Sequence, residues 1–179
     1  KLASKGIKES QIVRCAEYVR DYDLKLLKLY MVFGYAEETM EDIDEMIDFI
    51  GELTQICDIA LGMSPLVAKK NTPLDGLPFQ DEKFLESKIK RLNEALGRQI
   101  DVRSTSIRWA WIEYALAQGG WEMADAAEEV WQDGGSFGAW KRAIKKHRKS
   151  TTILARPTSD RLQSGALLGD VSVLPPSVA

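Results

Sequence analysis

The chain has 179 residues, of which 45% are hydrophobic and 28% are charged, and its formal net charge is −3. This length fits one domain with a single core, and the composition is that of an ordinary soluble globular protein. The small negative charge excludes a strong overall attraction to nucleic acid or anionic membranes, and no apolar run approaches the ~20 residues of a membrane span.

The N-terminus and the cysteines bear on the cellular setting. The first ten residues, KLASKGIKES, are basic without an apolar core after them, so we expect no secretory signal and a cytoplasmic location. The chain begins with lysine and not methionine, and we therefore expect a fragment or a processed piece. Cys15 and Cys57 are isolated and lie in or beside apolar segments, which favours free thiols and leaves a disulfide open.

The chain starts with a predicted amphipathic helix over residues 8–22, where Ile12, Cys15 and Val19 form one apolar stripe. Residues 26–33 follow as a nearly unbroken apolar run. A run this short and this rich in β-formers predicts a parallel strand that is buried on both faces.

Alternation along this predicted strand assigns its side chains to two faces. Leu29, Met31 and Phe33 belong to one face, and Tyr30 and Val32 to the other.

A turn and a helix come after the strand. Gly34 lets the backbone turn, and Thr39 is a predicted N-cap with Asp42 three residues later. Helical spacing of apolar residues continues to Leu53.

A second apolar strand is predicted over residues 56–63, so the order of elements indicates βαβ units in a parallel sheet. The loop 64–78 then carries three prolines and one glycine. A loop at the carboxyl end of a parallel strand is a candidate ligand site, although the same loop could be a proline-stiffened connection.

The rest of the chain is mostly helical. Apolar spacing and breakers predict helices over residues 80–96, 107–118, 121–132 and 136–147, with a possible short strand over 99–103. Residues 150–179 read as an extended or partly disordered tail. The predicted fold class is therefore α/β and helix-rich.

Residues 28–43, KLYMVFGYAEETMEDI, resemble the fifth strand and the following helix of radical S-adenosylmethionine (radical SAM) barrels, which commonly read KLYFMIGLPGET with an aspartate three positions on. The chain departs from this pattern at Tyr35, Ala36 and Glu37, where the family often has Leu, Pro and Gly, so the pocket is expected to be altered or closed. The matching residues are Lys28, Leu29, Tyr30, Gly34, Glu38, Thr39 and Asp42.

A second stretch, SPLVAKKNTPL at residues 64–74, resembles the end of the sixth strand in a group of radical SAM proteins that often carry a cobalamin-type domain. That group reads SPFVPKPHTPF. The matching residues are Ser64, Pro65, Val67, Lys69, Thr72 and Pro73.

The later helices also resemble this group, and the resemblance spans roughly residues 1–140. The matching residues are Trp109, Glu113, Leu116, Gly119, Trp131, Gly134, Phe137 and Trp140.

The resemblance implies the C-terminal part of a partial (β/α) barrel at residues 1–78, a helical extension at 79–149 and the tail at 150–179. It also implies that the backbone after the first strand lies against the adenine of S-adenosylmethionine. Turn 34–38 and loop 64–69 would then form one rim, with free backbone amides for the adenine edge and apolar side chains for its face. The implied cofactor-binding residues are Phe33, Gly34, Glu38, Ser64, Leu66 and Val67, with Glu38 orienting backbone amides.

Radical SAM chemistry needs a [4Fe–4S] cluster on three cysteines spaced CxxxCxxC, and this chain has no such triplet. We therefore predict no catalytic residue and no metal ligand in this chain, which would be inactive alone; the parent protein would hold the cluster. His147 is the single histidine and is expected to be a solvated residue at a helix C-terminus. The dense carboxylates of residues 37–48 are expected to form a solvated helix face.

A small parallel sheet would leave an apolar edge, so we expect the N-terminal half of the barrel or a second copy to cover it. The alternative function is a non-catalytic helical module for protein interaction or RNA contact. The RNA contact would use the basic run Lys141, Arg142, Lys145, Lys146, Arg148 and Lys149, although one short run on a net-acidic chain favours a solvated helix end. A CxxxCxxC motif upstream of this chain would decide for the enzyme.

Overall fold

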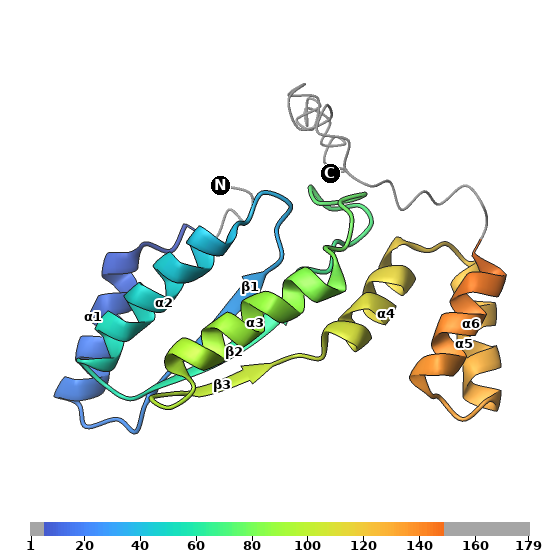
Figure 1. The fold of residues 1–179 in the computed structure, drawn as a ribbon. Helices are drawn as coiled ribbons and strands as arrows, with labels where there is room; N and C mark the ends of the chain where they lie inside the picture. Colours follow the sequence, from blue (N-terminus) through green and yellow to red (C-terminus); the bar gives the residue numbers. More distant parts are fainter. Residues whose placement is uncertain (1–5, 149–179) are drawn as a thin grey trace, which may run out of the picture.

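The computed structural model describes residues 6–148 as three strands and six helices (Figure 1). The predicted tail at 150–179 lies outside the described residues. The α/β, helix-rich class is confirmed. The elements are α1 (Glu9–Asp21), β1 (Leu27–Phe33), α2 (Met40–Thr54), β2 (Ile59–Pro65), α3 (Glu82–Leu96), β3 (Asp101–Ser104), α4 (Ile107–Gln118), α5 (Glu122–Gln132) and α6 (Phe137–His147).

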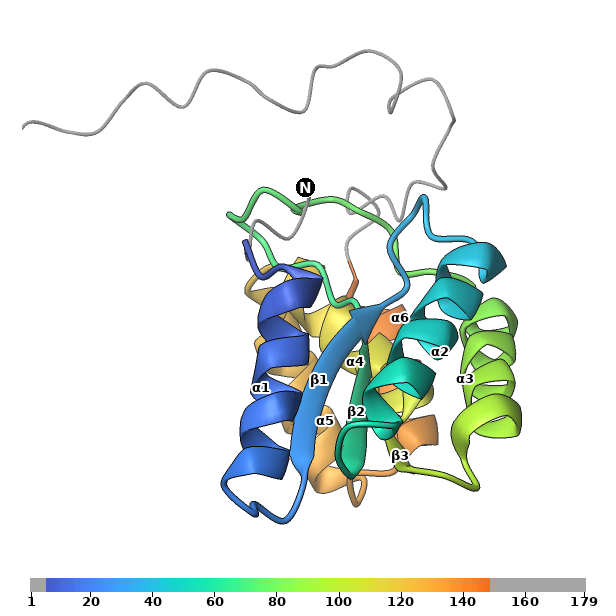
Figure 2. The same cartoon turned by 90° about the vertical axis from the view of Figure 1, so that its left-hand side faces the viewer.

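The three strands form one parallel sheet in the order β1-β2-β3. The register aligns Tyr30 with Gly62 and Gly62 with Arg103. The connecting helices α2 and α3 lie side by side on one face of the sheet (Figure 2). The possible third strand is thus confirmed, since it pairs in parallel with β2.

The core lies between the sheet and these helices. Phe33, Leu61 and Met63 point into it from β1 and β2, and each is 1% exposed. Apolar residues of α2 and α3, together with Ala16 of α1, complete the cluster. Helix α3 contributes Leu85, Leu92 and Leu96 to this core, and Val102 of β3 packs against it.

The prediction that β1 is buried on both faces is wrong. Tyr30 is 71% exposed and Val32 is 39% exposed, whereas Phe33 on the alternate face is buried. Successive side chains of a strand point to opposite faces, and α2 and α3 cover only one of them. Within residues 6–148, the other face of the sheet is open.

Local signals set the element boundaries. The Thr39 hydroxyl accepts from the Asp42 amide, and the Asp42 carboxylate accepts from the Thr39 amide, so the predicted N-cap of α2 is confirmed. The Thr39 amide and then the Thr39 hydroxyl, which both donate to the Asp42 carboxylate, lower the pKa of Asp42. Strand β2 begins at Ile59, later than predicted, because the amides of Ile56 and Cys57 bond the Leu53 carbonyl and prolong the end of α2.

A second, smaller core holds the helical extension together. Helix α6 packs against α5 and α4. The buried residues of this cluster are Ile112, Met123, Ala126, Val130, Ala139, Ala143 and Ile144.

Candidate ligand-binding site

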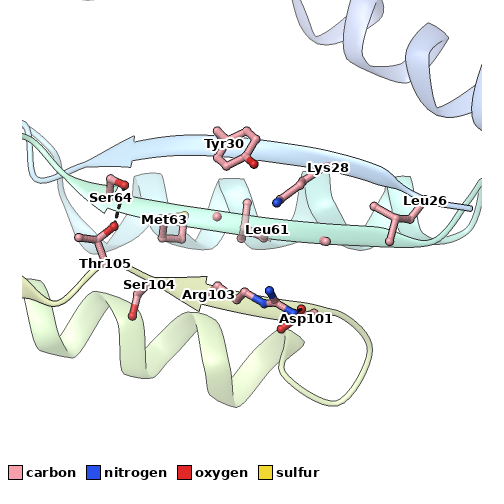
Figure 3. A pocket seen from close by; sticks show the side chains of 12 residues that line it. Leu26, Lys28, Tyr30, Leu61, Met63, Ser64, Asp101, Arg103, Ser104 and Thr105 are labelled. Carbon is pink, nitrogen blue, oxygen red and sulfur yellow. Dashed lines mark hydrogen bonds and ion pairs between the residues drawn. The ribbon is translucent and has the colours of Figure 1, made fainter.

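The open face of the sheet carries its smallest residues on the central strand. The register sets Ala60 and Gly62 of β2 between residues of β1 and β3 with longer side chains. Figure 3 shows three of these longer side chains, Lys28, Tyr30 and Arg103. The resulting depression, which we call the sheet hollow, has a volume of about 360 Å³. Its lining includes Lys28, Tyr30, Ser64, Asp101, Arg103 and Thr105.

Tyr30 of β1 and Gly62 of β2 are paired in the sheet register and pack against each other in the sheet hollow. A Cβ atom added at Gly62 would lie 2.9 Å from Cδ1 of Tyr30, so the tyrosine ring rests on the glycine backbone. The Lys28 ammonium lies 5.0 Å from the centre of the same ring, within the range of a cation–π contact. On β3, Arg103 forms an ion pair with Asp101 at 2.7 Å.

A second depression, the rim hollow, lies at the carboxyl ends of the strands and has a volume of about 350 Å³. It adjoins the sheet hollow, because Ser64 and Thr105 line both. Their hydroxyl oxygens are 3.0 Å apart and hydrogen-bonded. Apolar walls come from Leu66 and Val67, so the rim hollow offers an apolar surface beside hydroxyl groups.

Turn 34–38 and loop 64–69 lie next to each other, as predicted. Phe33 and Pro65 are aligned in the β1–β2 register, and the Leu66 amide donates to the Phe33 carbonyl at 2.7 Å. Both segments therefore leave the same end of the sheet.

Helix α4 holds the loop after β2 in place. The buried Gln118 amide donates to the Ala68 carbonyl at 2.9 Å, and the Lys70 ammonium donates to the Gly119 carbonyl at 2.8 Å. Lys69 pairs with Glu113, and both line the rim hollow. A charged pair at the edge of an apolar depression is a means of binding polar ligand groups.

Three expected contacts to a cofactor are corrected by the structure. The Phe33 side chain is 1% exposed in the core, so it cannot touch a ligand at the rim. The Gly34 amide donates to the Glu38 carboxylate and the Leu66 amide to the Phe33 carbonyl, so neither amide is free. The side chains of Ser64, Leu66 and Val67 do line the rim hollow.

Glu38 serves the turn, as predicted, and it has a partner that the sequence analysis missed. The Lys88 ammonium lies 2.7 Å from Oε1 of Glu38, and Lys88 is fully buried. Its position between Leu85 and Leu92, on the apolar stripe of α3, was the available signal. The pKa of the Tyr35 hydroxyl is raised, mainly by burial and to a lesser extent by the nearby Glu38 carboxylate.

Two cations of the basic run at the end of α6, Arg142 and Lys146, are paired with carboxylates. Lys146 and His147 each lie 2.7 Å from Glu129 of α5, and these bonds lower the pKa of Glu129. Arg142 pairs with Asp133. His147 is the last residue of α6, as predicted, but it is not solvated, because its side chain is 21% exposed and hydrogen-bonded to Glu129. A surface of paired charges attracts RNA phosphates less than a basic one.

Among residues 6–148, no group of three or more His, Cys, Asp or Glu side chains is arranged to hold a metal ion. Cys15 is exposed and Cys57 is partly buried; both are free thiols, and burial raises the pKa of Cys57. The described helices include none that is long and apolar enough to span a membrane.

Comparisons with known proteins give one relative without an assigned function. The chain is 27% identical over 99 residues to an uncharacterized protein of Methanocaldococcus jannaschii, a stretch that covers 53% of this chain and 21% of that protein. The chain thus spans about a fifth of the length of this relative. No family model and no solved structure matches the chain.

Proposed function

We propose that this chain is the C-terminal part of the catalytic barrel of a radical SAM enzyme together with its helical extension. The observation that carries the proposal is the one-sided parallel sheet, with helices on one face and small and polar residues on the other. A barrel wall has this arrangement, because its strands face the interior and its helices face outward. The sequence resemblance in three successive segments supports the same assignment.

The rim hollow suits part of S-adenosylmethionine. Leu66 and Val67 give an apolar surface for the adenine face, while the hydroxyls of Ser64 and Thr105 and the Lys69–Glu113 pair suit polar groups of the ligand. In this role the chain binds and orients, and the bound cofactor would supply the radical chemistry of the superfamily. Of the residues that the resemblance implies, Ser64, Leu66 and Val67 line the rim hollow, and they are the binding set that we propose for this chain.

The iron–sulfur cluster has to be held outside this chain. A [4Fe–4S] cluster requires clustered thiolates, and the two cysteines lie on α1 and directly before β2. We therefore assign the cluster to the remaining, N-terminal part of the barrel, which would also cover the open face of the sheet. The chain alone is then inactive.

The second candidate function is a helical module for protein or RNA contact. Trp121 and Trp131 of the α5 region are 95% and 80% exposed, and exposed aromatic residues are typical of binding surfaces. The ion pairs between α5 and α6 favour a protein partner over RNA for this surface.

Calorimetric titration with S-adenosylmethionine tests the proposal. It uses the proposed parent protein, in which this chain is joined to the N-terminal part of the barrel and which we call the full-length protein. Val67→Asp places a carboxylate in the rim hollow, and we expect affinity to fall about tenfold or more, a loss of roughly 1.4 kcal/mol. Tyr22→Asp is the matched control, because Tyr22 is 72% exposed at the other end of the sheet, and it should bind as the wild type does. A wild-type protein that fails to bind S-adenosylmethionine would refute the proposal.

A further inference from the structure

Lys88 is the only charged side chain in residues 6–148 that is completely buried. Its ammonium group lies 2.7 Å from Oε1 of Glu38, 3.2 Å from the Glu38 carbonyl oxygen and 3.1 Å from Oε1 of Gln80. These three acceptors match the three protons of an ammonium group. The centre of the Phe84 ring lies 4.5 Å from the same nitrogen, within the range of a cation–π contact.

The partners of Lys88 hold the backbone of turn 34–38. The Glu38 carboxylate accepts from the Gly34 amide through Oε1 at 3.0 Å and Oε2 at 3.1 Å. The Gln80 side-chain amide donates to the Tyr35 carbonyl at 3.2 Å. Lys88 therefore connects helix α3 to both ends of the turn, and we call this group of four residues, Gly34, Glu38, Gln80 and Lys88, the turn brace.

Stability alone does not account for the turn brace. A buried ion pair loses the hydration of both charges, and replacement by apolar residues is often neutral or stabilising. The turn brace instead selects one conformation of the turn, because its hydrogen bonds are all satisfied only in that conformation. The turn begins beside Leu66, whose amide donates to the Phe33 carbonyl, and Leu66 lines the rim hollow.

We propose that Lys88 is a positioning residue that acts through Glu38 to fix turn 34–38 against Leu66, which lines the rim hollow. Its consequence for S-adenosylmethionine binding rests on the proposed function, whereas the positioning of the turn does not. Lys88 itself does not contact the ligand, because it is fully buried on α3. We expect its removal to make the turn more mobile and to leave the sheet folded.

Amide hydrogen exchange of the full chain measures this directly. In Lys88→Met, a long apolar side chain fills the site, and we expect exchange in residues 34–38 to become about tenfold faster while β2 and α3 keep their protection. The control is Lys90→Met, because Lys90 lies on the same helix with its side chain 76% exposed. Unchanged exchange in the turn, or an equal increase throughout the chain, would overturn the inference.

A double variant covers the case in which the orphaned Glu38 unfolds the single variant. Lys88→Met with Glu38→Gln removes both charges and keeps an acceptor for the Gly34 amide. We expect the turn still to exchange faster than in the wild type, because its connection to α3 is lost. Wild-type protection of the turn in this variant would show that Lys88 is only a counter-ion and would overturn the proposal.

Ligand binding separates this inference from the proposed function. In the full-length protein, Lys88→Met should weaken binding of S-adenosylmethionine about tenfold, and Lys90→Met should not change it. If the wild type does not bind S-adenosylmethionine, the proposed function fails and the exchange result still decides the role of Lys88. If wild-type binding occurs and Lys88→Met leaves it unchanged, the link between turn and ligand is overturned.

Discussion

Gly34 is constrained by its backbone and by its packing. Its φ of +90° lies in the left-handed region, which L side chains rarely adopt, and an added Cβ would lie 2.8 Å from Cδ2 of Leu85. A substitution such as Gly34→Val would therefore disturb the fold before it reported on a ligand. This is why Val67, which lines the rim hollow, is the better probe of binding.

Gly34→Ala should lower the free energy of unfolding by roughly 1–3 kcal/mol, because it adds backbone strain and a clash with Leu85. Gly76→Ala is the matched control, since Gly76 has a φ of +76° with open space around it. Gly76→Ala therefore adds the backbone strain without a clash. Urea unfolding of both variants would contradict this account if the two losses were equal.

Side-chain pairing is the part of the structure that the sequence signals least. The apolar stripe of α3 predicts a helix face, but it does not say that Lys88 on that face reaches Glu38, 50 positions away in the sequence. The pairing of His147 with Glu129 depends likewise on how α5 and α6 pack. Both contacts join different elements, so local spacing could not specify them.

At the scale of elements, the boundaries of β1 and α2 were predictable because the signals are local. An apolar run ends at Gly34, and Thr39 with Asp42 forms the capping box of α2. The burial of β1 was mispredicted because Tyr30 and Val32 are apolar although they point to the open face. Composition of a strand does not reveal whether a helix covers each of its faces.

The two faces of β1 should respond differently to a charge. Met31→Asp places a carboxylate against the core, where it lacks a partner, and we expect the free energy of unfolding to fall by about 3 kcal/mol or more. Tyr30→Asp, on the open face, should cost less than about 1 kcal/mol in the isolated chain. Chemical denaturation followed by circular dichroism compares them, and similar losses would show that the faces are equivalent.

At the scale of the whole molecule, the sheet is asymmetric. One face is covered by α2 and α3, and the other carries Tyr30 resting on Gly62 between Lys28 and Arg103. A three-stranded parallel sheet with one open face is unusual, since parallel sheets are normally covered on both sides. The asymmetry is explained if the open face is the inner wall of a barrel that the N-terminal part completes.

Thiol labelling at position 30 tests this claim most directly. In a Cys15→Ser, Cys57→Ser background, Tyr30→Cys reports on the open face and Lys90→Cys reports on the outer surface of α3. We expect rapid labelling of both thiols in the isolated chain, and at least about tenfold slower labelling at position 30 alone in the full-length protein. Equally rapid labelling at position 30 in both proteins would show that nothing covers the sheet and would contradict the barrel.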